Sequence, residues 1–198
     1  MKKLISIYLT VILLFCMMPV TAFAKESDNM TLQELEQRIK NSSHAEIKDA
    51  DGNVLETLEI DIHVQKSLPS RSADGDEYTI TCIARAADND EYSDSDTKDG
   101  YIAILTMVCK DVIGRDNLLI SVSGSFSGNV NETRNRTISY AAYNTSDFEI
   151  SSREFTNVGL SYLYTPVDYV GYTFRAWGSA EITATGNYLY LYVSTDAI

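Results

Sequence analysis

The feature that most constrains this chain is a period of two in side-chain polarity, which recurs from residue 45 to the C-terminus. In the segment LEIDIHV, residues 58–64, apolar side chains alternate with acidic and imidazole side chains. Successive side chains of a β-strand point to opposite faces, so this alternation predicts a strand with one buried and one wet face. Turn residues separate eight or nine such segments. We therefore expect an all-β fold, an antiparallel β-sandwich or an open barrel of about eight or nine strands.

One segment near the N-terminus has a helical period instead. In SDNMTLQELEQRIKNSS, residues 27–43, Leu32, Leu35 and Ile39 recur on one face. Thr31 and Glu34 form a capping box ahead of them. The sequence thus predicts one short helix in a segment spanning residues 25–44, followed by a β domain over residues 45–198. The apolar face of this helix either packs against the domain or binds a partner.

The last hairpin, AEITATGNYLYLYV at residues 180–193, is predicted in most detail. A two-residue Gly186-Asn187 connection would set Thr185 opposite Tyr188 and Ile182 opposite Leu191. Two faces follow from this pairing. The apolar face comprises Ala180, Ile182, Ala184, Leu189, Leu191 and Val193, and the other face comprises Thr183, Thr185, Tyr188, Tyr190 and Tyr192. Earlier in the chain, an Asp51-Gly52 turn of type I′ is expected, YIAILTMVCK is expected to be a central core strand, and LLISVSGSFSG alternates Ile120, Val122, Gly124 and Phe126 with serines.

Less than half of the chain, from residue 118 to the end, contains a V-S-G-S strand, an N-R-x-[IV]-x-Y strand (Asn135, Arg136, Ile138 and Tyr140) and a terminal strand pair. In these motifs it resembles a group of small secreted β-rich proteins of Gram-positive bacteria. The resemblance implies a secreted β-rich protein. That group has no known activity, so the resemblance implies no functional residue.

The first 24 residues have the organisation of a secretory signal peptide. Lys2 and Lys3 precede an apolar run from residue 4 to residue 20, and Ala22-Phe23-Ala24 supplies the small-x-small pattern that signal peptidase recognises. The alternative is a membrane anchor, because the apolar run is about the minimum length for a spanning helix. We expect cleavage after Ala24 and a secreted, extracellular protein without a stable membrane anchor.

Charge and residue content restrict the partners and the chemistry. The formal net charge is −12, and such a surface repels nucleic acid. His44 and His63 are the two histidines, and neither belongs to a nucleophile–base pattern. Gly124-Ser-Phe-Ser-Gly128 has phenylalanine where a nucleophile elbow needs serine. No catalytic residue is assigned. A hydrolase using carboxylates and a toxin or bacteriocin-like factor remain alternatives to a binding module.

The stretch AADNDEYSDSDTKDG, residues 86–100, concentrates acidic residues between two expected strands. Asp94, Asp96 and Asp99 precede Gly100 and offer carboxylate oxygens at the close spacing that calcium accepts. The sequence therefore gives one candidate cofactor, Ca²⁺, at these three residues. The alternative is a solvated loop.

Two cysteines, Cys82 and Cys109, lie outside the leader on the strands that flank this stretch. A hairpin centred between Ser95 and Asp96 would set them directly opposite each other. Opposed Cβ atoms lie about 4.5–5.5 Å apart, close to disulfide reach. In an exported chain this predicts a disulfide between Cys82 and Cys109.

Thirteen tyrosines and one tryptophan are the remaining candidates for binding. Tyr188, Tyr190 and Tyr192 share one strand face, with Trp177 upstream. Such a strip either stacks on sugar rings, or contacts a protein, or only stabilises the sheet through cross-strand packing. We expect a secreted, non-enzymatic binding module whose partner is a cell-surface glycan or protein.

Overall fold

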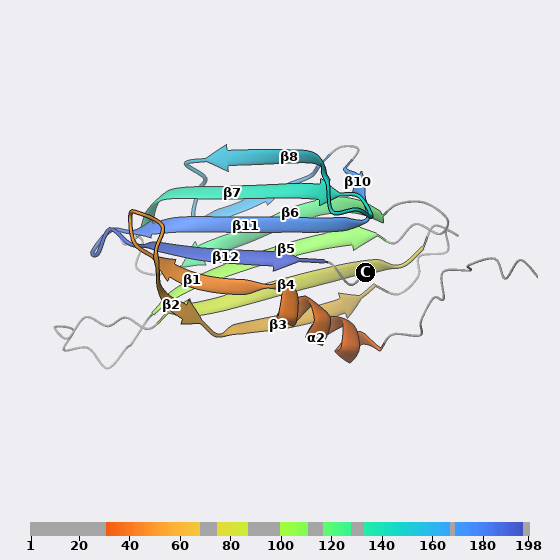
Figure 1. Cartoon of the computed structure of the whole chain (residues 1–198), viewed down its shortest axis with the longest axis horizontal. Coiled ribbons are helices and arrows are strands. Elements are labelled where there is room, and N and C mark those ends of the chain that lie inside the picture. Colours follow the sequence, from red (N-terminus) through yellow and green to blue (C-terminus); the bar gives the residue numbers. More distant parts are fainter. Residues whose placement is uncertain are drawn as a thin grey trace, which may run out of the picture. The chain divides into compact units, whose positions relative to one another are not determined.

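Two antiparallel sheets make up most of the chain that the computed structural model describes, which comprises residues 31–67, 75–86, 100–110, 117–127, 133–166 and 169–195 (Figure 1). The first, sheet A, has the order β2 (Val54–Leu58), β1 (His44–Lys48), β12 (Tyr188–Ser194), β11 (Thr173–Ile182), β7 (Thr133–Tyr143) and β8 (Glu149–Thr156). The second, sheet B, has the order β10 (Val170–Gly171), β6 (Asn117–Ser127), β5 (Tyr101–Lys110), β4 (Glu77–Ala86) and β3 (Ile60–Lys66), and β9 (Ser161–Tyr164) also pairs with β6.

The predicted all-β, sandwich-like fold is confirmed, with twelve strands in the described residues against the eight or nine expected. Part of the difference lies at Glu59. The alternating run through LEIDIHV is not one strand, because the chain leaves sheet A after Leu58 and enters sheet B at Ile60. Its face assignment is nevertheless correct. Ile60 and Ile62 are buried, while Asp61 and His63 are exposed.

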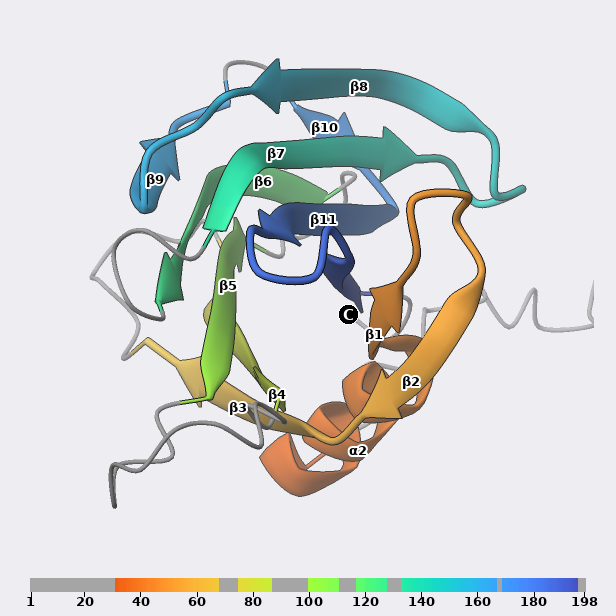
Figure 2. The same cartoon turned by 90° about the vertical axis from the view of Figure 1, so that its left-hand side faces the viewer.

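Helix α2 (Leu32–Ser42) closes one open side of the sandwich. Its Leu35 and Ile39 are buried, whereas Leu32 is 43 % exposed. Figure 2 shows the helix at the side where β2 of sheet A and β3 of sheet B diverge. The helix therefore covers one side of the hydrophobic core with its buried face. Within the described residues, no helix is long and apolar enough to cross a membrane.

The two sheets meet through small residues that admit large ones. Gly178 on β11 leaves room for Phe126 of sheet B, whose Cζ lies 3.1 Å from where a Cβ would stand. Within sheet B, Gly124 on β6 leaves room for Tyr162 of the neighbouring strand β9, because a Cβ there would lie 2.4 Å from the tyrosine hydroxyl. Gly124 and Phe126 thus have packing roles in the structure.

Two local predictions about backbone geometry are wrong. Gly52 has a φ of 87°, but Asp51 is not left-handed, so the turn is not type I′. Instead Asp49 Oδ1 accepts hydrogen bonds from the backbone N–H groups of Asp51 and Asn53. In β6, a bulge opposite Val108/Cys109 buries Leu119 in place of Ile120.

The predicted registers of two hairpins are also wrong. Cys82 lies opposite Leu105, and Cys109 lies opposite Tyr78. The two cysteines are therefore separated by four positions along the sheet, about 13 Å, which no disulfide can bridge. Both are buried free thiols, and the predicted Cys82–Cys109 disulfide is wrong.

In the C-terminal hairpin, Glu181 lies opposite Tyr188 and Ala180 opposite Leu189. The connection runs from Ile182 to Asn187 and leaves Ala184 exposed. The rest of the predicted apolar face is buried, namely Ala180, Ile182, Leu189, Leu191 and Val193. Two further predictions, signal cleavage at Ala24 and calcium binding by Asp94, Asp96 and Asp99, concern residues outside the described ranges.

Candidate ligand-binding face

The outer face of sheet A brings together the aromatic residues singled out in the sequence. Antiparallel pairing aligns outward side chains in rows across the strands. The first row contains His44, Tyr192, Trp177, Ser139 and Glu154 on β1, β12, β11, β7 and β8. The second contains Glu46, Tyr190, Ser179 and Thr137, and the third contains Lys48, Tyr188, Glu181 and Arg134. We call His44, Trp177, Tyr188, Tyr190 and Tyr192 the aromatic face.

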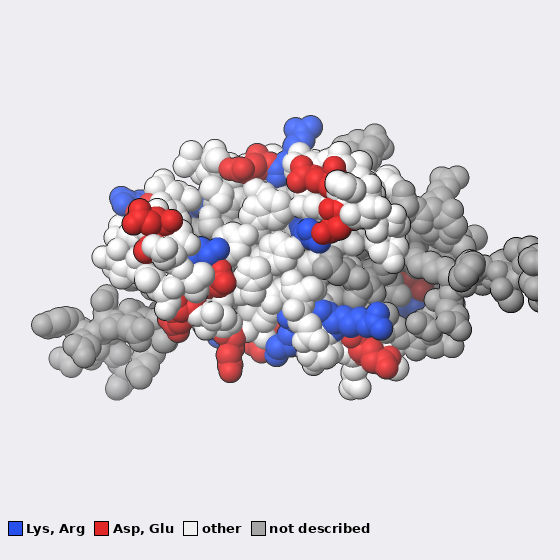
Figure 3. Space-filling view, in the orientation of Figure 1, with Lys and Arg blue, Asp and Glu red and all other residues white. Residues whose placement is uncertain are grey.

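The aromatic face is partly open to solvent. Trp177 and the three tyrosines are half-buried, and His44 is exposed. Helix α2 lies along β3 and the end of β12, beside this face. Figure 3 views the molecule from the side of sheet A and shows a central area without lysine, arginine, aspartate or glutamate. The predicted grouping of these four aromatic side chains on one face is therefore present in the fold.

Charged residues around the aromatic face are paired with one another. Lys48 Nζ lies 3.0 Å from Glu46 Oε2, and Arg175 Nη2 lies 2.5 Å from Asp147 Oδ1. Arg134 contacts Glu181 at the opposite end of the face. Each of these pairs cancels its own charge, and Glu154, at the end of the first row, is the charged residue of the three rows that these pairs leave over.

At one end of the face, a carboxylate fixes Tyr188. Glu181 accepts hydrogen bonds from Arg134 Nε at 2.9 Å and from Asn135 Nδ2 at 2.5 Å, and it also bonds the side chain of Tyr188. The Arg134 guanidinium chiefly, and these other donors, hold the pKa of Glu181 below its usual value. Tyr188 therefore already has a hydrogen-bond partner within the protein.

Tyr190, in the second row, also contacts other residues of the protein. Lys48 Nζ lies 4.2 Å from the centroid of the Tyr190 ring, which is a cation–π contact. Burial, with smaller contributions from Tyr192 and Glu46, raises the pKa of the Tyr190 hydroxyl to about 12. Tyr190 therefore remains a neutral phenol at physiological pH.

The aromatic side chains of the first row differ in the contacts that they make. His44 stacks on Tyr192, with ring centroids 4.9 Å apart and planes 25° apart. Among the described residues, the Trp177 indole has no hydrogen-bond, ion-pair or ring partner. A half-exposed indole without a partner offers both an apolar ring surface and an N–H donor.

Sequence reasoning missed His44 as a member of this face. It was assigned to the helical segment, whereas it opens β1 and lies opposite Tyr192. One local signal could have found it. His44, Glu46 and Lys48 alternate with Ala45 and Ile47, a pattern that predicts a strand with one polar and one apolar face. Pairing with the last strand of the chain is not visible in that local pattern.

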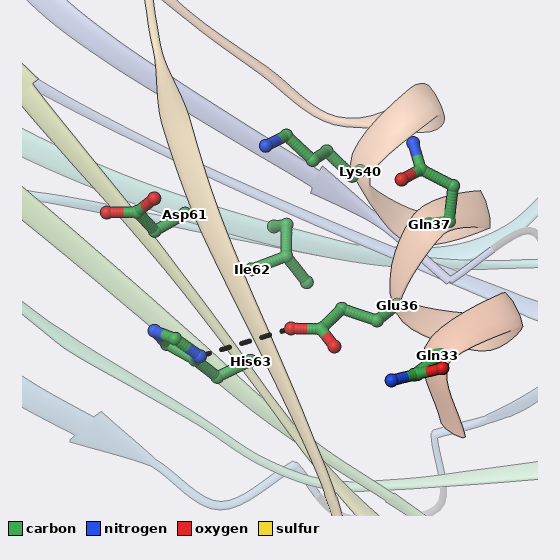
Figure 4. A pocket seen from close by; sticks show the side chains of 7 residues that line it. All are labelled: Gln33, Glu36, Gln37, Lys40, Asp61, Ile62 and His63. Atoms are coloured by element: carbon green, nitrogen blue, oxygen red, sulfur yellow. Dashed lines mark ion pairs between the residues drawn. The ribbon is translucent and has the colours of Figure 1, made fainter. Parts of the chain in front are cut away.

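A groove between α2 and β3 is the other concave feature (Figure 4). It has a volume of about 320 Å³ and is lined by Gln33, Glu36, Gln37, Lys40, Asp61, Ile62 and His63. His63 Nδ1 lies 3.9 Å from Glu36 Oε1, with both side chains well exposed. In the ranges that the structure describes, no three His, Cys, Asp or Glu side chains are grouped so that they could hold a metal ion. The groove is thus lined mainly by polar side chains, and its described residues include no cluster that could hold a metal ion.

Comparison of the chain with models of known protein families, with curated protein sequences and with solved structures finds no match. The argument for function therefore depends on the geometry of the aromatic face.

Proposed function

We propose that this protein is an exported, non-enzymatic binding module whose partner, a glycan or a protein at the cell surface, docks on the aromatic face. One observation carries the proposal: Trp177, Tyr188, Tyr190 and Tyr192 lie half-exposed together on a sheet face whose central area has no charged side chain. Aromatic side chains combine a large apolar surface with a polar tip, and they lose little conformational entropy on binding.

The position of these rings supports a binding role. β11 and β12 are interior strands of sheet A, paired on both sides, so their backbone is fixed before a ligand arrives. A site on rigid strands holds its contact groups in place and reduces the entropic cost of association.

The proposal is tested with protein recovered from culture medium of the producing cells. Export predicts that its N-terminal residue is Lys25. Binding to intact cells and to cell-surface extract is then compared for the wild type, a Trp177→Ala/Tyr192→Ala double variant and a Leu163→Ala control. Leu163 is 68 % exposed on β9 of sheet B, so its variant removes a comparable apolar side chain from another surface.

We expect the wild type and the control to bind alike, and the double variant to bind at least tenfold more weakly. Circular dichroism must show the same strand content in all three proteins. Equal binding by the double variant would show that the partner docks elsewhere, and absence of binding to both materials would contradict the proposal itself.

A further inference from the structure

The two ends of the aromatic face differ in what their side chains are free to contact. Tyr188 is bonded to Glu181, and the Tyr190 ring lies under Lys48. The Trp177 indole, by contrast, has no side-chain partner within the described chain. A ligand at Tyr188 or Tyr190 would have to displace an existing contact, whereas a ligand at Trp177 would not.

The charges around Trp177 restrict the kind of ligand that can bind there. Glu46 and Asp147 are paired with Lys48 and Arg175, so these four groups present no net charge. Glu154, at the far end of the first row, is exposed and would repel an anion. A neutral ligand needs no counter-charge here, and it escapes the repulsion that a protein of net charge −12 exerts on an anion.

Hydrogen-bonding groups accompany the free indole. Ser179 lies near Trp177 on β11, and its hydroxyl lies 2.7 Å from that of Thr137 on β7. Ser139, directly opposite Trp177, is buried. His44 and Tyr192 continue the row on the other side. Adjacent rings with a hydroxyl side chain beside them suit a ligand with apolar C–H faces and many hydroxyls.

We propose that the ligand is a neutral glycan, and that one of its sugar rings stacks on Trp177 in the row of His44, Tyr192 and Trp177. Tyr188 and Tyr190 support this row from within the protein and do not contact the glycan directly. This inference rests on the proposed function, since it names the ligand class and the subsite of the same face.

The chain carries its own probe for the test, because Trp177 is its only tryptophan. Its fluorescence is titrated with neutral oligosaccharides (cellohexaose, xylohexaose and maltohexaose) and with acidic ones (hexagalacturonate and a hyaluronan hexasaccharide). We expect saturable emission changes with at least one neutral oligosaccharide and none with the acidic ones.

Affinities of variants are then measured by isothermal titration calorimetry with the best neutral oligosaccharide. We expect Trp177→Ala to weaken binding at least tenfold, Trp177→Phe to weaken it less, and Leu163→Ala, on the exposed surface of β9 in sheet B, to change it less than threefold. Trp177→Phe keeps a ring in place, so the test holds even where Trp177→Ala fails to fold.

The outcomes separate this inference from the proposed function. Binding of acidic glycans, or of a protein partner, that depends on Trp177 and Tyr192 would overturn the neutral glycan and leave the binding face intact. Neutral glycan binding that Trp177→Ala weakens no more than Leu163→Ala does would overturn the assignment of the subsite. A protein that binds none of the oligosaccharides and no cell-surface material would overturn both.

Discussion

Gly124 provides the sharpest test of how β5, β6 and β9 pack against one another within sheet B. A Cβ at this position would stand 2.1 Å from the backbone oxygen of Ile104 and 2.4 Å from the hydroxyl of Tyr162. The backbone of Gly124 is not left-handed, so alanine is not excluded by conformation. The effect of Gly124→Ala therefore reports on packing alone.

The expected magnitude follows from which atoms must move. Overpacking typically costs about 1–3 kcal/mol, and here one neighbour is backbone of the adjacent strand, which cannot rotate away. We expect Gly124→Ala to lower the free energy of unfolding by about 3 kcal/mol. With a urea m-value of about 2 kcal/mol per M, the midpoint falls by about 1.5 M, and the melting temperature falls by about 6–12 °C.

The assay is equilibrium urea unfolding followed by circular dichroism, with Gly178→Ala as the matched control. A Cβ at Gly178 would meet Phe126 Cζ at 3.1 Å and Ile138 Cδ1 at 3.4 Å, which are movable ends of side chains. That variant should stay within about 1 kcal/mol of the wild type, since replacing glycine in a strand offsets part of the crowding. In a Tyr162→Ala background, Gly124→Ala should cost about 1–2 kcal/mol less, because one of its two close contacts is gone. A Gly124→Ala variant as stable as the Gly178→Ala variant would refute the reasoning.

Three further predictions concern titratable and acidic groups. Burial raises the pKa of the Cys82 thiol to about 12 and raises that of Cys109 further, so neither should react with a thiol reagent until denaturant is added; mass analysis without reductant should find both thiols free. The pKa of Glu181 is lower in the folded chain than in the unfolded chain, so its contribution to stability is present above about pH 4.5 and is lost as the pH falls through the folded-state pKa. Between pH 6 and pH 3, the melting temperature of the wild type should therefore fall more steeply than that of Glu181→Gln. Parallel curves of melting temperature against pH would contradict this. Melting in calcium and then in chelator should give one unchanged temperature if residues 88–99 form a solvated loop, whereas a rise that chelator reverses would support Asp94, Asp96 and Asp99 as ligands.

The aromatic face was predictable from the sequence, although the register of its C-terminal hairpin was not. The observed pairing, with Glu181 opposite Tyr188, is displaced by four positions from the predicted one, with Thr185 opposite Tyr188. Side-chain direction along a strand has a period of two, so an even displacement exchanges partners but keeps every residue on its face. The cysteine hairpin shows the same displacement, and there the partners mattered, because a disulfide requires one particular pair.

What remained unpredictable depends on contacts between distant parts of the chain. Nothing in the strand HAEIK indicates that it pairs with the C-terminal strand, so His44 was missed. The passage from sheet A to sheet B at Glu59 was also hidden, because the alternation continues across it unchanged. Local patterns determine which face is buried, whereas the choice of neighbouring strand depends on the packing of the whole domain.

The insertion of β12 between β1 and β11 has a consequence for when the protein can bind. The row of His44, Tyr192 and Trp177 joins the first and last strands of the described fold, so it is absent from any chain whose C-terminal segment has not yet emerged or has been removed. Pairings of such long sequence separation form late and slowly. The proposed ligand binding would then depend on a complete chain, because the row forms only once β12 has paired with both β1 and β11.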